Sequence, residues 1–171
     1  MPERDILTAA NEGYAGGFSS GDLPMPPGRR LAVVTCMDAR LDPARFLGLE
    51  PGDAHVIRNA GGLVTDDALR SLVISHWLLG TQEVAVIAHT DCGMLTFTND
   101  DLRGRLADEA GADAGHVDFL PFDDLETSVR GSLQAIRESP LLPGSLELSG
   151  WVYDVTSGRI AEVREAAGVV R

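Results

Sequence analysis

The sequence predicts a single α/β domain with a mostly parallel central sheet, built from about four parallel strands plus a C-terminal antiparallel strand and flanked by helices. Three observations predict this fold class. Continuous apolar segments at 31–36 and 83–89 are typical of strands that are buried on both faces. Segments with helical capping signals alternate with these strands, as in parallel sheets. The 171 residues, 44% of them hydrophobic, suffice for one such core.

The first 30 residues differ from the core that we expect over residues 31–163. A short helix with Ile6, Ala10 and Tyr14 on one face leads into the segment LPMPPGRR, which favours stiff, extended backbone. This N-terminal arm could pack on the body of its own subunit or across a partner subunit. From the residues alone, packing on its own subunit is the simpler expectation.

The chain between the two most apolar strands contains a further strand and two helices. A short helix is predicted from its capping residue Asp42 to Gly48. Residues 54–60 predict a strand, which the two glycines that follow interrupt. A longer helix is predicted from a cap at Thr65 to Gly80, because glycine commonly ends helices.

The second half of the chain predicts two more helices. We expect the first to be capped by Asn99 and to end near Gly111, with a loop over 112–121 behind it. The next helix begins at Asp123 or Asp124 and stops before a proline. Both helices precede the last strands of the sheet.

The C-terminal strands are predicted to form a hairpin. Residues 149–155 and 158–163 are apolar enough for two strands, and a Thr-Ser-Gly turn connects them. The last strand is therefore antiparallel to its neighbour. If the strand at 54–60 packs outside the one at 31–36, then the strands at 31–36 and 83–89 flank the point where strand order reverses.

Composition excludes some classes of function. The net charge is −12, and an acidic chain without a basic patch is a poor nucleic-acid binder. No apolar segment is long enough to span a bilayer, and the N-terminus has no signal-peptide pattern. We therefore expect no nucleic acid, no membrane and a cytoplasmic location.

Three metal-binding residue types follow the two buried strands. Cys36 ends the first strand, His89 ends the other, and Cys92 comes three residues later. Two thiolates and one imidazole suit zinc, and three protein ligands with one open position are typical of catalytic zinc sites. The alternative is that the cysteines are buried and inert, as many are.

A carboxylate and a guanidinium stand beside the first of these cysteines. Arg40 has a planar fork that suits a carboxylate, so it could hold Asp38 ionised and aimed at the open position of the metal. The two residues could equally form an ordinary surface ion pair. Asp91 lies between two expected ligands, and the sequence indicates no role for it.

The segments CMDAR (36–40), RNAGG (58–62) and HTDCG (89–93) resemble, in order and spacing, the three signature segments of the β-class carbonic anhydrases. The resemblance covers about residues 25–163. It implies reversible hydration of carbon dioxide to bicarbonate and a proton by a zinc-bound hydroxide. It also implies a set of site residues: Cys36, His89 and Cys92 as ligands of one Zn²⁺ per subunit, Asp38 and Arg40 as a catalytic dyad, and Gly61 and Gly62 in the substrate pocket.

The same resemblance implies an assembly. Members of this family are homodimers or tetramers with active-site clefts at the subunit interface, and their N-terminal arm embraces the partner. It also leaves open a closed state in which Asp38 moves onto the zinc.

The remaining histidines, His55, His76 and His116, are expected to be structural or exposed; His116 is the least implausible proton shuttle among them.

Two other functions remain open. Small proteins with this fold and these motifs hydrolyse carbonyl sulfide or carbon disulfide, whose carbon the same nucleophile would attack. A non-catalytic protein is the second alternative, in which Cys36 and Cys92 act as a redox pair or close a structural metal site. That function would not need Asp38 and Arg40.

Overall fold

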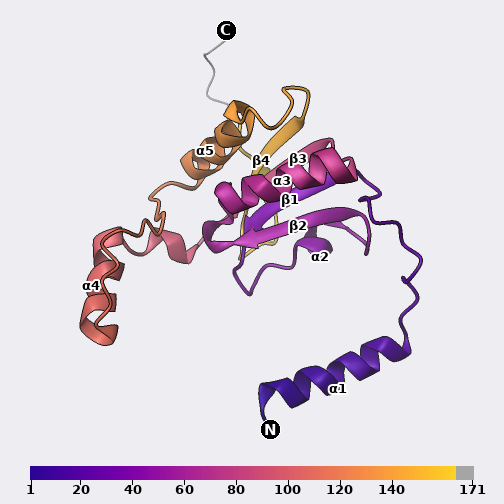
Figure 1. The fold of residues 1–171 in the computed structure, drawn as a ribbon, viewed down its shortest axis with the longest axis horizontal. Helices are drawn as coiled ribbons and strands as arrows, with labels where there is room; N and C mark the ends of the chain where they lie inside the picture. Colours follow the sequence, from indigo (N-terminus) through magenta and orange to yellow (C-terminus); the bar gives the residue numbers. More distant parts are fainter. Residues whose placement is uncertain (165–171) are drawn as a thin grey trace.

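The computed structural model describes residues 1–164 and contains one five-stranded sheet in the order β2-β1-β3-β4-β5 (Figure 1). Strands β2, β1, β3 and β4 are parallel, and β5 is antiparallel to β4. The predicted α/β fold class and the C-terminal hairpin are confirmed. The strands are β1 (Leu31–Cys36), β2 (Ala54–Asn59), β3 (Glu83–His89), β4 (Glu147–Tyr153) and β5 (Ile160–Glu162).

The strand order places β1 between β2 and β3, which is the condition under which the ends of β1 and β3 flank the reversal of strand order. Consequently β1 and β3 are buried almost throughout, whereas the residues of β2 are half-buried or exposed. The carboxyl ends of β1 and β3 lie at the point where strand order reverses, which is where open α/β sheets bind ligands.

Helices cover both faces of the sheet. On one face, α3 and α5 pack against the side chains that the even-numbered positions of β1 present, such as Val34. On the other face, the segment around α2 packs against Val33 and Ile87. The helices are α1 (Glu3–Gly16), α2 (Pro43–Leu47), α3 (Asp66–Leu79), α4 (Asn99–Ala110) and α5 (Leu125–Glu138), and the short 3₁₀ turns are η1 (Ala60–Gly62) and η2 (Gly93–Leu95).

Several predicted boundaries, those of β2, β4, β5 and the start of α4, are wrong by one or two residues. Thr98, not Asn99, caps α4, because its hydroxyl accepts from the amide of Asp101 while the Asp101 carboxylate accepts from the amide of Thr98. Strand β4 starts and ends two residues early. It ends because the Asp154 carboxylate accepts from the amide of Thr156 and so starts the hairpin turn.

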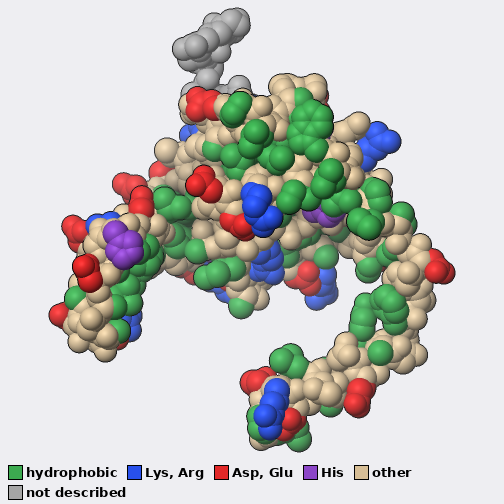
Figure 2. Space-filling view, viewed as in Figure 1, with side chains coloured by type: hydrophobic (Ala, Val, Ile, Leu, Met, Phe, Trp, Pro, Cys, Tyr) green, Lys and Arg blue, Asp and Glu red, His purple; other side chains and the backbone are tan. Residues whose placement is uncertain are grey.

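Two helices stand away from this body. No residue of α1 or of α4 is buried, and both project from the sheet and its covering helices (Figure 1). Figure 2 shows hydrophobic side chains on the surface of the N-terminal segment. Helix α1 therefore lies clear of the body within residues 1–164, whereas the end of the arm packs on its own subunit: Pro27 is buried, and the amide of Gly28 donates to the carbonyl oxygen of Gly52 at 2.8 Å.

The chain has no helix, within residues 1–164, that is both long and apolar enough to cross a membrane.

Candidate metal centre

The ends of β1 and β3 bring two cysteines and a histidine together. The Sγ atoms of Cys36 and Cys92 and one ring nitrogen of His89 all lie within 4.8 Å of one another, and all three residues are buried. Ligand atoms around a tetrahedral zinc ion lie about 3.5–4 Å apart, from ordinary Zn–S and Zn–N bond lengths. The three side chains are therefore near the geometry of a shared metal ion.

His89 presents an unpaired nitrogen to this space. Its Nδ1 lies 2.9 Å from the carbonyl oxygen of Thr90, which can only accept, so Nδ1 carries the proton. Its Nε2 is buried and has no hydrogen-bond partner among residues 1–164. A buried nitrogen without a partner is costly in a folded protein. A metal ion at this position would bind Nε2, and the carbonyl of Thr90 would keep the ring oriented.

The two thiols also favour a cation. Burial, and then the negative charge of the neighbouring Cys36, raise the pKa of the Cys92 thiol to about 11. A pair of thiolates in this buried environment needs a positive partner, and a coordinated metal ion supplies one. The donor set and the unpaired Nε2 thus agree on a metal such as zinc.

Two glycines of η1 pack against the end of β1. Gly61 has φ of 82° and Gly62 has φ of 67°, both in the left-handed region. A Cβ on Gly62 would lie 2.8 Å from the backbone nitrogen of Cys36, and one on Gly61 would lie 2.9 Å from the ring of Phe122. Only glycine lets this loop approach the metal-binding strand so closely.

The surroundings of the two cysteines are mostly apolar. Leu41 and Met94 are buried beside Cys36 and Cys92, and partly buried aromatic and aliphatic side chains pack against this cluster. Those side chains are Phe46, Leu95, Phe97, Phe122, Leu125, Tyr153 and Val155. Such surroundings suit a small neutral molecule better than a charged one.

Asp38 and Arg40 form a two-point ion pair at the mouth of the site. The Nε and Nη2 atoms of Arg40 lie 3.0 and 2.7 Å from the two carboxylate oxygens of Asp38. Hydrogen bonds from the side chain and the backbone amide of Arg40 hold the pKa of Asp38 far below its usual range. Asp38 Oδ2 also lies 3.8 Å from Nε2 of His89, so an ionised carboxylate faces the metal position.

Comparison with known proteins decides the family. The family model described as carbonic anhydrase matches residues 31–118. Beta-carbonic anhydrase 1 of Mycobacterium tuberculosis is 48% identical over 165 residues, which span 95% of this chain and 99% of that protein. The chain belongs to the β-carbonic anhydrase family. Family membership agrees with the zinc-type donor set of Cys36, His89 and Cys92.

Two further proteins, one from each class of candidate activity, are similar to this chain. The crystal structure of carbonic anhydrase from Streptococcus mutans has a TM-score of 0.93 and 49% identity, and the match covers 96% of this chain and 99% of that one. A carbon disulfide hydrolase from Acidianus is 37% identical over 160 residues, spanning 80% of this chain and 78% of that protein. Membership of an enzyme family weighs against the non-catalytic alternative that the cysteine pair left open.

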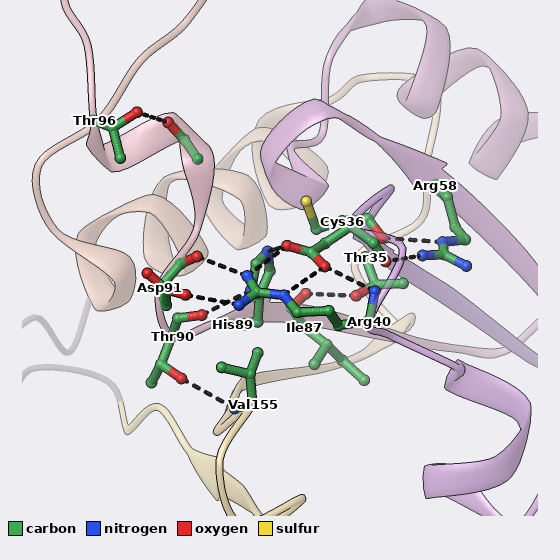
Figure 3. A network of polar contacts seen from close by, with 12 residues as sticks. Thr35, Cys36, Arg40, Arg58, Ile87, His89, Thr90, Asp91, Thr96 and Val155 are labelled. Carbon is green, nitrogen blue, oxygen red and sulfur yellow. Dashed lines mark hydrogen bonds and ion pairs between the residues drawn. The ribbon is translucent and has the colours of Figure 1, made fainter.

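Sequence reasoning missed two contacts of this β-carbonic anhydrase site. Asp91, to which no role was given, accepts a hydrogen bond from Nη1 of Arg40 at 2.7 Å (Figure 3). Arg58 donates to the carbonyl oxygens of Cys36 and Asp38, at 3.0 and 2.7 Å, and so fixes the backbone after β1. Both contacts join segments that are distant in the sequence, and no local pattern signals them.

The other histidines lie outside the metal centre. Nδ1 of His55 lies 2.7 Å from the hydroxyl of Ser75, and Nδ1 of His76 lies 2.7 Å from the carbonyl oxygen of Thr81. His55 thus joins β2 to α3, whereas His76 contacts the turn that follows α3. His116 is exposed in the loop after α4.

Proposed function

We propose that this protein catalyses the reversible hydration of carbon dioxide to bicarbonate and a proton, with one zinc ion per subunit held by Cys36, His89 and Cys92. One observation carries the proposal. A buried, unpaired histidine nitrogen and two buried sulfurs meet beside an ionised carboxylate, in a chain of the carbonic anhydrase family. When bound, zinc lowers the pKa of a coordinated water toward about 7 and so supplies a nucleophile near neutral pH.

Asp38 acts in this proposal as a hydrogen-bond acceptor. Because Arg40 keeps the pKa of Asp38 far below its usual range, Asp38 stays a carboxylate at every pH at which the enzyme works. A carboxylate only accepts hydrogen bonds. Asp38 therefore orients the attacking water through its proton, and Arg40 holds Asp38 in place.

Gly61 and Gly62 shape the substrate pocket in this proposal. Their lack of side chains lets the backbone of η1 approach the end of β1, beside the metal position. The apolar side chains of Leu41 and Met94 border the same space. A small, neutral and linear molecule such as carbon dioxide fits this environment.

Stopped-flow carbon dioxide hydration at pH 8.5, followed with a pH indicator, tests the proposal on the zinc-loaded protein. We expect rapid turnover in the parent and a loss of about 10²–10⁴-fold in kcat/KM for Asp38→Ala, the range typical of a positioned acid–base group. Asp123→Ala removes an exposed carboxylate outside the metal centre and should match the parent. No turnover in a parent with one zinc per subunit would contradict the proposal.

Hydrolysis of carbon disulfide or carbonyl sulfide is the second candidate. The 37% identical carbon disulfide hydrolase and the apolar surroundings of the two cysteines support it. The more similar relatives favour carbon dioxide. The ratio of kcat/KM for carbon dioxide to that for each sulfur gas, measured on the same preparation, separates the two candidates.

The active form in this proposal is a cytoplasmic homodimer. Helix α1 has no buried residue, and an isolated helix of this length is marginal in water, so a partner surface must stabilise it. The arm of one subunit lying across a second copy meets this need, and a pair of such dimers would give a tetramer. Two unpaired cysteines suit a reducing compartment such as the cytoplasm.

A further inference from the structure

Arg40 contacts a second acidic residue that the proposed roles leave unused. Its Nη1 lies 2.7 Å from Oδ2 of Asp91, and its Nη2 lies 2.9 Å from the main-chain oxygen of Asp91. Figure 3 shows the Arg40 side chain lying across the site toward Asp91, with His89 beside it. The Arg40 guanidinium is therefore held on two sides, by Asp38 and by Asp91.

These contacts join the segments that follow β1 and β3, the two strands that end in metal-binding residues. Asp38 and Arg40 follow β1, whereas Asp91 follows β3 and lies between His89 and Cys92. Arg40 spans the gap, because its Nε and Nη2 bind Asp38 while Nη1 and Nη2 bind Asp91. A planar guanidinium fixed at three nitrogen atoms has little freedom to rotate.

The backbone of Asp91 is arranged for this contact. Its φ is 54°, in the left-handed region that residues other than glycine seldom adopt. In this conformation the carboxylate and the main-chain oxygen of Asp91 both reach the Arg40 guanidinium. Uncommon backbone conformations of this kind gather at functional sites.

We propose that Asp91 is a positioning residue that, through Arg40, fixes the Asp38 carboxylate beside the metal position. This inference rests on the proposed function. Without the Asp91 carboxylate, one edge of the Arg40 guanidinium is released, and the Arg40–Asp38 pair can shift together. Because Asp38 Oδ2 lies only 3.8 Å from Nε2 of His89, a small shift changes how Asp38 faces the metal.

The opposing view is that Arg40 and Asp91 form an ordinary surface ion pair. The Asp91 side chain is 76% exposed, and isolated exposed pairs contribute little to stability. The two views differ in what they expect of Asp38. A surface pair leaves its position and its catalytic contribution unchanged when Asp91 is replaced.

Two substitutions of Asp91 separate its side chain from its backbone. Asp91→Gly removes the carboxylate while keeping the left-handed backbone unstrained, and the main-chain contact with Arg40 stays available. Asp91→Asn keeps an acceptor oxygen, and asparagine tolerates the same backbone. Asp67→Asn, which removes a charge from the exposed Arg70–Asp67 pair on α3, is the matched control.

The zinc-loaded variants are compared in carbon dioxide hydration. For Asp91→Gly we expect kcat to fall about 10–100-fold with KM little changed, the size of effect that a misplacement of about 1 Å produces. Asp91→Asn should retain more than half of the parent kcat, and Asp67→Asn should match the parent. If Asp91→Gly stays within twofold of the parent, or if Asp91→Asn falls as far as Asp91→Gly, the proposal is overturned.

Crystal structures and NMR of the same zinc-loaded proteins give a readout that does not depend on activity. In Asp91→Gly we expect the Asp38 carboxylate to be displaced or to occupy several positions, and the Arg40 Nε–H signal to exchange faster with solvent than in the parent. An unmoved Asp38 and an unchanged Arg40 signal would overturn the proposal. A parent without carbon dioxide turnover would contradict the proposed function instead, while these two readouts would still test the positioning by Asp91.

Discussion

His89 shows at the level of a single side chain how the fold prepares a metal site. One ring nitrogen donates to a main-chain carbonyl, and the other has no partner and faces two buried sulfurs. The sequence predicted that Cys36, His89 and Cys92 would meet, because residues that end neighbouring parallel strands lie at one edge of the sheet. Their convergence is observed, while their roles as zinc ligands stay a proposal.

Asp91 marks the limit of such reasoning at this scale. Its contact with Arg40 requires a left-handed backbone and the approach of a second loop. Neither has a local signal, since aspartate between two ligands is compatible with many orientations. The contacts of Arg58 were missed for the same reason, because its partners are main-chain oxygens at the end of another strand.

Gly62 gives a prediction at this scale. Gly62→Ala should destabilise the fold by about 2–4 kcal/mol, because it adds left-handed strain and a clash with the backbone of Cys36. Gly80→Ala is the control, since Gly80 also has positive φ but open space around it. It should cost only about 1–2 kcal/mol. Urea unfolding measures both, and equal losses would show that the contact with Cys36 is unimportant.

At the scale of elements, capping residues and apolar segments located most of the structure. Asp42 and Thr65 cap α2 and α3, as their positions before apolar segments predicted, and of the two candidates for α5 it is Asp124 that forms the cap. Strands β1 and β3 were recognised because burial on both faces makes them continuously apolar. Thr98 was missed as a cap because Asn99, beside it, is an equally good capping type, and only the contact with Asp101 decides between them.

The cap of α5 predicts a pH dependence of stability. A hydrogen bond with Thr127 lowers the pKa of Asp124, which means that folding favours its ionised form. A lowered folded-state pKa contributes stability above the unfolded pKa of about 3.9, and this contribution is lost as pH falls through the folded pKa. Asp124→Ala should therefore lower the unfolding free energy at pH 7, with the difference from the parent shrinking below about pH 4.

Urea unfolding at pH 7 and in steps down to pH 3 measures this difference. The neighbouring Asp123→Ala is the control, because Asp124 and not Asp123 occupies the capping position. A difference between Asp124→Ala and the parent that is constant over this range would argue against a charge-dependent cap.

At the scale of the whole molecule, the arm is the feature that one subunit cannot explain. Residues 1–19 are exposed throughout and include apolar side chains such as Leu7, Tyr14 and Phe18. Sequence reasoning found the helix, but it could not decide from the residues alone what the helix packs against. That choice depends on a surface outside the segment, which no local pattern encodes.

Removing residues 1–19 should therefore weaken self-association. We expect sedimentation velocity at micromolar concentration to give a dimer or larger species for the parent and a smaller species for the shortened chain. The circular dichroism of the sheet and its covering helices should persist, because α1 contributes no buried residue. Tyr14→Ser should act in the same direction, and Glu12→Ser, which lies off the apolar face, should not. Identical masses for the parent and the shortened chain would contradict an arm-mediated dimer.

The separation of Cys36 from the other two metal-binding residues has a consequence for how the protein matures in a cell. Before β1 and β3 pair, the growing chain offers a metal only the local His89 and Cys92 pair, which is a weak chelator. The third donor arrives with the sheet, so tight capture of the ion waits until that pairing is complete. Since an ion that binds only the native state stabilises it by mass action, bound metal marks the molecules that folded correctly. Scarcity of zinc would then shorten the lifetime of the polypeptide as well as limit its activity.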